Sequence, residues 1–193
     1  MMNAVKACVN GLFLAIAFPV AAVSGFGRVT QVFRFGAQMF ALVPGLPGDY
    51  GRIAYYRLTL RRCSLESRIS FGSFFAHPEV VIGEKVYIGA YCILGRCTIG
   101  DRTQIASQVQ ILSGRRQHKR ETDGRISGAE NGELEHVDIG EDCWIGAGSI
   151  IMASIGPNTT IGSGAVVVHS IPAHTVAVGN PARTIREQEK CQK

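Results

Sequence analysis

The chain of 193 residues is long enough for one domain with an appendage. It is 46% hydrophobic and only 18% charged, which is more apolar than a typical soluble protein. Its net charge of +5 resides in the first third, where residues 1–68 hold eight Lys or Arg against two acids, whereas the remainder holds 12 against 13. Because these basic residues share their segment with bare apolar ones, the pattern argues against nucleic acid as a partner and favours a membrane surface.

Residues 7–27 form the first predicted element, a stretch of 21 residues without a charge. That length is sufficient to cross a hydrocarbon core of ~30 Å. The stretch fits a cleaved signal peptide, because Lys6 precedes an apolar middle and Ala22-Val23-Ser24 follows Pro19. It also fits a single transmembrane helix kinked at Pro19. A third alternative is a re-entrant or interfacial insertion, in which Pro19 and the glycines at 25 and 27 turn the chain back.

The two segments that follow favour the interfacial alternative. In residues 28–43, polar side chains recur every three or four positions and form one narrow stripe on a predicted helix whose other faces are apolar (Arg28, Gln31, Arg34 and Gln38). Residues 50–63 form a second basic segment that combines four arginines with three tyrosines (Arg52, Arg57, Arg61 and Arg62; Tyr50, Tyr55 and Tyr56). Both side-chain types suit the headgroup layer of a bilayer. We therefore expect residues 1–68 to be a helical membrane-association region.

From residue 81 to residue 186 a six-residue pattern recurs, in which a branched aliphatic residue precedes a small one, as in Ile82-Gly83, Ile99-Gly100 and Ile145-Gly146. The aliphatic residue and the residue four places later share one face of a short strand, so both should point into a core. We expect the glycine to supply the backbone freedom that a corner requires. Hexapeptide periodicity marks a parallel β-helix with ~18 residues per coil, whereas a β-sandwich needs turns at other intervals. The predicted fold is mainly β, with roughly five coils over residues 69–186.

The six cysteines show no CxxC pair. Cys92 and Cys143 occupy the small inward position of the repeat. This usage indicates reduced thiols in a cytosolic setting and gives no support for structural zinc.

Residues 113–136 interrupt the repeat. Ten of these 24 residues are charged, and glycines recur at 114, 124, 128 and 132. A segment of this length and composition is predicted to be a loop extruded from the wall of the β-helix, and such loops are often functional. Residues 187–193 form a short polar tail.

Histidine is the strongest acid–base candidate, because the sequence contains no phosphate-binding GxxxxGK[ST], no GxGxxG and no GxSxG nucleophile motif. His118 lies in the extruded loop among four cationic residues, which would keep its imidazole neutral, as a general base requires. His136 closes the same loop and is predicted to reach the same cleft. His77 precedes Pro78 and is interpreted as a turn residue, and the remaining two histidines are expected on the surface (His169 and His174).

Three motifs carry a resemblance to a known family: Cys143-Trp144-Ile145-Gly146-Ala147-Gly148, Ile161-Gly162-Ser163-Gly164 and Val178-Gly179-Asn180-Pro181-Ala182-Arg183-Thr184-Ile185-Arg186. From residue 77 onward the chain resembles the hexapeptide-repeat acyltransferases. Within them it is similar to the maltose, galactoside and nodulation-factor sugar O-acetyltransferases, and more closely to the membrane-associated acetyltransferases of exopolysaccharide pathways. The resemblance implies a left-handed β-helix and a homotrimer.

The resemblance also implies site residues. Acetyl-CoA would lie in a groove between subunits, with contacts from four residues of the coils and phosphate contacts from two arginines (Trp144, Ala147, Ser163 and Gly164; Arg183 and Arg186). The general base of the family follows a Ser/Thr-Gly step, here Ser113-Gly114; Arg115 takes the place of the first histidine, and His118 is the nearest substitute. His136 matches a histidine that serine acetyltransferases use near the acceptor.

The expected function is direct transfer of an acetyl group from acetyl-CoA to a sugar hydroxyl of a cell-envelope or exopolysaccharide precursor. His118 or His136 would act as the general base, without a metal ion, and the sugar acceptor would be lipid-linked at the cytoplasmic face of the cell membrane. The alternatives are a serine-type acetyltransferase, a metal-binding β-helix trimer of the carbonic-anhydrase type and a non-catalytic scaffold.

Overall fold

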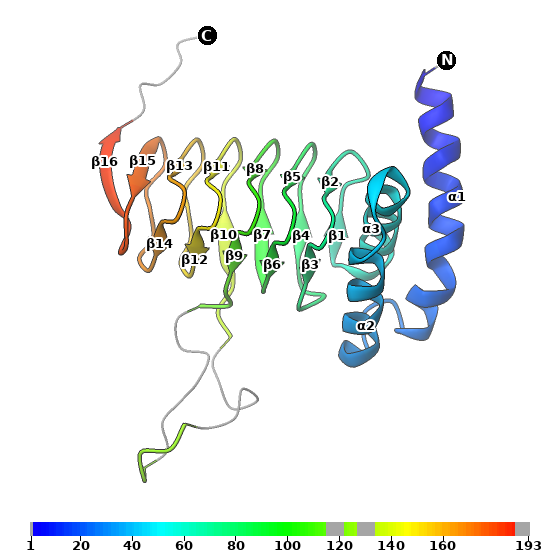
Figure 1. Cartoon of the computed structure of the whole chain (residues 1–193), viewed down its shortest axis with the longest axis horizontal. Helices are drawn as coiled ribbons and strands as arrows, with labels where there is room; N and C mark the ends of the chain where they lie inside the picture. The colour runs from blue at the N-terminus through cyan, green and yellow to red at the C-terminus, as the bar shows by residue number, and fades with distance from the viewer. Residues whose placement is uncertain (1, 115–121, 127–133, 188–193) are drawn as a thin grey trace.

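A computed structural model describes residues 2–114, 122–126 and 134–187. Three helices stand at one end of a β-helix: α1 (Met2–Val23), α2 (Thr30–Ala41) and α3 (Gly45–Thr59). In Figure 1 the coils run away from these helices in a single stack, with α2 and α3 against the first coil and α1 on their outer side. We call the three helices the helical cap.

The described strands form three sheets, and parallel pairing stacks each coil on the next. The four-stranded sheet contains β1 (Arg62–Cys63), β4 (Val81–Ile82), β7 (Cys97–Ile99) and β10 (Val137–Ile139). The seven-stranded sheet contains β2 (Arg68–Ile69), β5 (Tyr87–Ile88), β8 (Gln104–Ile105), β11 (Trp144–Ile145), β13 (Thr160–Ile161), β15 (Thr175–Val178) and the antiparallel β16 (Arg183–Glu187). The five-stranded sheet contains β3 (Phe74–Phe75), β6 (Ile93–Leu94), β9 (Gln110–Ile111), β12 (Ile150–Ile151) and β14 (Val166–Val167). The predicted β-helix of about five coils is confirmed, and its first coil begins at Arg62, before the predicted boundary at residue 69.

The inward positions of the repeat form the core as predicted. Ile82 pairs in register with Ile99 and Ile99 with Ile139, and single bridges extend this ladder to Ile155 and Ile171. The small inward residues are buried as well, among them four residues that lie four places after an aliphatic one (Val86, Cys92, Val109 and Cys143). Since each coil covers the apolar edge of the one before, the core is continuous along the stack.

The predicted role of the repeat glycines is wrong. Positive φ angles occur at Lys85 (57°), Arg102 (60°) and Asp142 (54°), each two residues beyond the glycine that follows the aliphatic residue, whereas that glycine itself is not in this region (Gly83, Gly100 and Gly140). A Cβ atom on Gly146 would lie 2.4 Å from the backbone nitrogen of Ser163 in the next coil. Glycine is therefore required because two backbones approach closely, rather than to turn the corner.

The prediction that residues 50–63 face lipid headgroups is wrong for Arg52, Tyr55 and Tyr56, which are all fully buried. The first coil has no preceding coil to pair with, and α3 supplies the missing hydrogen-bond partners. Arg52 Nε donates to the Ile69 carbonyl at 2.8 Å, and the Phe75 amide donates to the Tyr56 hydroxyl at 3.2 Å. The helical cap thus covers a strand edge that would otherwise be open.

The outer surface of the helical cap is apolar. Twelve large hydrophobic side chains are exposed there (Val5, Leu12, Ile16, Phe18, Val23, Phe26, Val29, Phe35, Met39, Leu42, Val43 and Leu46). Among the described residues, only α1 contains a window long and apolar enough to cross a membrane, and 11% of that window is buried in the protein. An exposed apolar surface of this extent indicates a site of interaction with another protein or with a membrane.

Candidate active site

The β-helix is a three-sided prism, and its extruded loop leaves from the edge where the five-stranded sheet turns into the four-stranded sheet. We call this edge the loop edge. The chain departs after Ser113-Gly114 and returns at Glu135, whose amide donates to the Ser113 carbonyl at 3.0 Å. Gly114 has φ +83°, and a Cβ there would lie 2.6 Å from the Glu135 side chain. The predicted loop is therefore present with a closed neck; the candidate base His118 lies outside the described residues.

His136 stands at this neck, directly before β10. Its Nε2 lies 2.8 Å from the Thr98 hydroxyl and 3.5 Å from Asp138 Oδ1, and the side chain is 40% exposed. The Val137 amide donates to the Arg96 carbonyl, which fixes the backbone of His136 against the preceding coil. An imidazole that is oriented by a hydroxyl and a carboxylate and remains open to solvent has the geometry of a general base.

His136 lines a groove of about 250 Å³ on the loop edge together with His169, Ser154 and Ser170. His169 is exposed, as predicted, but its position beside His136 was not predicted from the sequence. The repeat contains the necessary signal, because Ile139, Ile155 and Ile171 stack in register and each follows a corner of this edge. Within the described part of the chain, no group of three His, Cys, Asp or Glu side chains lies close enough to hold a metal ion.

The residues predicted to contact acetyl-CoA lie on another side of the prism. Ala147 and Ser163-Gly164 are exposed at the edge between the seven-stranded and five-stranded sheets, where the Gly164 amide donates to the Ala147 carbonyl at 2.8 Å. Trp144 is 57% exposed on the seven-stranded sheet and borders a depression of about 350 Å³ with Tyr87 and Gln104.

The two predicted phosphate ligands, Arg183 and Arg186, are exposed on β16 at the C-terminal end of the seven-stranded sheet. Arg183 Nη1 donates to the Ala182 carbonyl at 3.1 Å. The structure therefore places these arginines, Trp144 and the edge residues on faces other than that of His136. One copy of the chain does not bring the candidate base and the predicted coenzyme contacts together.

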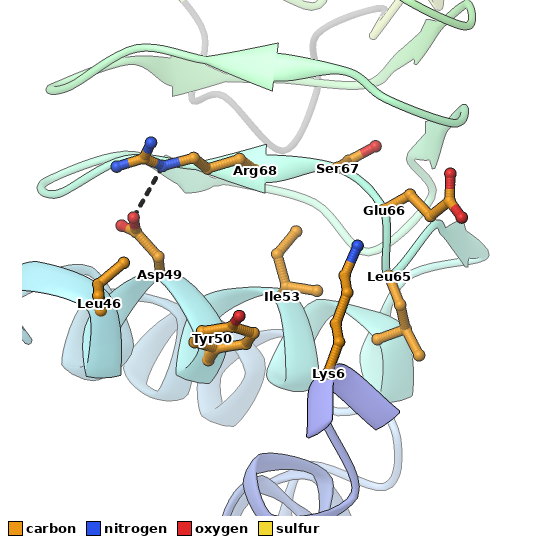
Figure 2. Close-up of a pocket in the computed structure, with 9 residues that line it drawn as sticks. All are labelled: Lys6, Leu46, Asp49, Tyr50, Ile53, Leu65, Glu66, Ser67 and Arg68. Atoms are coloured by element: carbon orange, nitrogen blue, oxygen red, sulfur yellow. Dashed lines mark hydrogen bonds and ion pairs between the residues drawn. The ribbon is translucent and has the colours of Figure 1, made fainter. Parts of the chain in front are cut away.

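A further cavity, of about 220 Å³, lies between the helical cap and the first coil. Figure 2 shows Lys6 of α1 extending toward it and Asp49 of α3 paired with Arg68 of β2. Asp49 also pairs with Arg52, at 2.6 Å, so this carboxylate is already neutralised by two guanidinium groups. No histidine lines the cavity, and it does not lie on the loop edge. It is therefore a poorer candidate for acyl transfer than the groove at His136.

Comparison with known proteins finds a matching family model and solved structures with the same fold. The family model described as "Bacterial transferase hexapeptide (six repeats)" matches residues 79–113. No curated protein matches the sequence. Among solved structures, a maltose O-acetyltransferase from Clostridium difficile 630 is 26% identical, with a TM-score of 0.71, over 88% of this chain and 91% of its own.

Two further structures share the fold at lower identity. A hexapeptide-repeat acetyltransferase from Vibrio cholerae, in complex with acetyl coenzyme A, is 19% identical, with a TM-score of 0.69, over 88% of this chain and 91% of its own. The polySia-specific acetyltransferase NeuO is 23% identical, with a TM-score of 0.55, over 66% of this chain; this chain spans 61% of its length. Coverage of 88% exceeds the coils alone, so the first two likenesses extend into the helical cap.

Proposed function

We propose that the chain is a hexapeptide-repeat acetyltransferase with a left-handed β-helix, which transfers an acetyl group from acetyl-CoA to a sugar hydroxyl of a cell-envelope or exopolysaccharide precursor. The observation that carries the proposal is the position of His136, oriented by Thr98 and Asp138 at the neck of the extruded loop. The similarity to a maltose O-acetyltransferase over most of both chains supports a sugar acceptor.

In the proposed reaction, the imidazole of His136 takes the proton of the acceptor hydroxyl as its oxygen attacks the thioester carbonyl. The C–O bond forms, the C–S bond breaks, and the imidazolium returns its proton to the departing thiolate of coenzyme A. General base catalysis of this kind contributes ~10²–10⁴-fold to the rate. His118, which belongs to the same loop, is the alternative base.

A homotrimer supports this chemistry. The candidate base and the predicted coenzyme contacts occupy different sides of one prism, so a shared site requires the loop edge of one copy to face the coenzyme surface of the next. A ring with threefold symmetry forms three identical sites of this kind. The exposed apolar surface of the helical cap would hold the trimer at the cytoplasmic face of the cell membrane, where acetyl-CoA is available and lipid-linked glycans are assembled.

Release of the coenzyme A thiol, measured with acetyl-CoA and sugar acceptors, tests the assignment of the base. We expect His136→Ala to lower kcat by ~10²–10⁴-fold while acetyl-CoA binding is retained. His174→Asn is the matched control: His174 lies away from the loop edge with φ 57°, and Asn158 adopts the same conformation (φ 54°) one coil earlier. Full activity of His136→Ala together with loss of activity in His118→Ala would transfer the role to His118.

A further inference from the structure

A second group of polar residues lies on the loop edge, between the helical cap and His136. Arg34 of α2 reaches the first coil, where its Nε donates to the Ala76 carbonyl at 3.0 Å. The next residue is His77, and the register of Phe75 with Leu94 places it beside Arg96 of the following coil. Arg96 in turn lies beside His136, because its carbonyl accepts the Val137 amide. Arginine side chains from two separate elements therefore converge on His77.

The backbone of Arg96 is fixed by hydrogen bonds, but its guanidinium group lacks a hydrogen-bond partner at one nitrogen. Its amide donates to the Ser113 hydroxyl at 2.9 Å, which fixes the residue at the root of the extruded loop. Its Nε is buried without a hydrogen-bond partner among the described residues, and its Nη2 lies 3.6 Å from Glu79 Oε1, beyond ordinary hydrogen-bond distance. A buried donor without a partner costs free energy, so an acceptor atom supplied by a ligand would be favourable at this position.

The electrostatic environment at this position is positive. Burial lowers the pKa of His77, and the charges of Arg96 and Arg34 lower it further, whereas Glu79 opposes them. Since Glu79 is half exposed and directed at Arg96, one carboxylate faces two guanidinium groups. The uncompensated positive charge favours an anion with several acceptor oxygens.

We propose that Arg34 and Arg96, with His77 between them, bind a phosphate group of the acceptor, so that the enzyme acts on a phosphate-linked sugar. Guanidinium groups match phosphate in charge and in paired donor geometry. The inference rests on the proposed function, because it places the sugar end of the acceptor at His136. The exposed apolar side chains of α2 beside Arg34, such as Phe35 and Met39, favour a lipid as the group on the other side of the phosphate.

Binding of inorganic pyrophosphate to the full-length protein, measured by calorimetry in the presence of saturating coenzyme A, tests the phosphate site directly. We expect Arg34→Gln and Arg96→Gln each to weaken this binding by roughly tenfold or more, because hydrogen bonds to charged groups are lost. Arg96→Lys keeps a charge at the root of the loop and should restore part of the affinity. Lys85→Gln is the control, because it removes a positive charge from a different edge at φ 57°, a conformation that Gln108 already adopts (φ 62°).

Three outcomes would overturn the proposal or part of it. Unchanged pyrophosphate affinity in both glutamine variants removes the site. Acetyl-CoA binding that weakens tenfold in the same variants assigns the arginines to the coenzyme phosphates instead. If farnesyl diphosphate binds no more tightly than uridine diphosphate, the group attached to the phosphate is not a lipid. The acceptor would then be a soluble phosphate-linked sugar.

A different result would refute the proposed acetyl transfer without affecting the phosphate site. Thiol release that is absent with every sugar acceptor would refute acetyl transfer while pyrophosphate binding at Arg34 and Arg96 stands. If transfer proceeds, the glutamine variants should raise the KM for a diphosphate-linked sugar by a larger factor than the KM for the free sugar.

Discussion

Substitution of Arg52 by methionine tests whether the buried guanidinium holds the helical cap onto the coils. Methionine retains the apolar stem but has no donor, so the carbonyls of Phe40, Val43 and Ile69 lose a hydrogen bond at 2.8–3.1 Å. Removal of one member of a buried charge pair costs about 3–5 kcal/mol. Since Asp49 keeps its contact with Arg68, we expect a loss near the lower end, about 3 kcal/mol.

Hydrogen exchange at residues 71–76 measures this loss, because the Gly72 amide donates to the Ala41 carbonyl and the Phe75 amide to the Tyr56 hydroxyl. A loss of about 3 kcal/mol should accelerate exchange through opening of the cap by roughly 10²-fold. Arg57→Met removes an exposed arginine from the same helix and should leave exchange unchanged. Equal exchange in the two variants would refute the bonding role of Arg52. Loss of vesicle binding in Arg52→Met alone, with unchanged exchange, would instead support a headgroup contact.

Three further predictions follow from packing and exposure. Gly146→Ala should destabilise the coils by about 1–3 kcal/mol in thermal unfolding, because its Cβ would meet the backbone of Ser163, whereas Gly148→Asn, in open space at φ +67°, should be nearly neutral. In a Cys191→Ser protein, a thiol reagent at pH 8 should label only the exposed Cys8. Burial raises the pKa of Cys63 to about 12 and also raises the pKa of Cys97, so these thiols stay protonated. Labelling of a second thiol before denaturation would contradict this prediction. Simultaneous Leu12→Gln and Ile16→Gln substitutions should reduce vesicle co-sedimentation but preserve thiol release, and undiminished sedimentation would exclude the apolar surface of α1 as the membrane contact.

The coils could be predicted from the sequence because their determinants are local. A short strand with an aliphatic residue and a small residue four places later buries both side chains, and neighbouring coils impose the same requirement on each other. The first coil nevertheless begins at Arg62, before the boundary predicted at residue 69. Its strand β2 has the same spacing, Ile69 and Ser73, but serine replaces glycine after Ile69. A glycine after the aliphatic residue is not required to turn the corner, since this position does not have a positive φ angle in the coils.

The burial of Arg52, Tyr55 and Tyr56 in α3 could not be predicted from the sequence, for a non-local reason. A segment with arginines and tyrosines has the composition of a headgroup-binding helix, and its hydrophobic pattern does not reveal whether another element covers it. Arg52 and Tyr56 are buried because the first coil presents unpaired backbone groups, which only a folded β-helix creates. The apolar outer surface of the cap, in contrast, follows from composition alone and was expected.

The extruded loop shows why the fold and the site are encoded differently. The loop adds 24 residues at one corner, yet Cys97 still pairs with Val137 across it, because the Glu135 amide and the Ser113 carbonyl close the neck. An insertion that leaves the coil register unchanged imposes no cost on the core, so its sequence is free to serve chemistry. The repeat therefore specifies the prism, whereas two of the residues that we propose for the acceptor, His136 and Arg34, lie at the neck of the loop and in the cap. Arg34 lies in the cap and Arg96 at a corner between β6 and β7; neither is a repeat position, and only the stacking of α2 and two coils brings them to one edge.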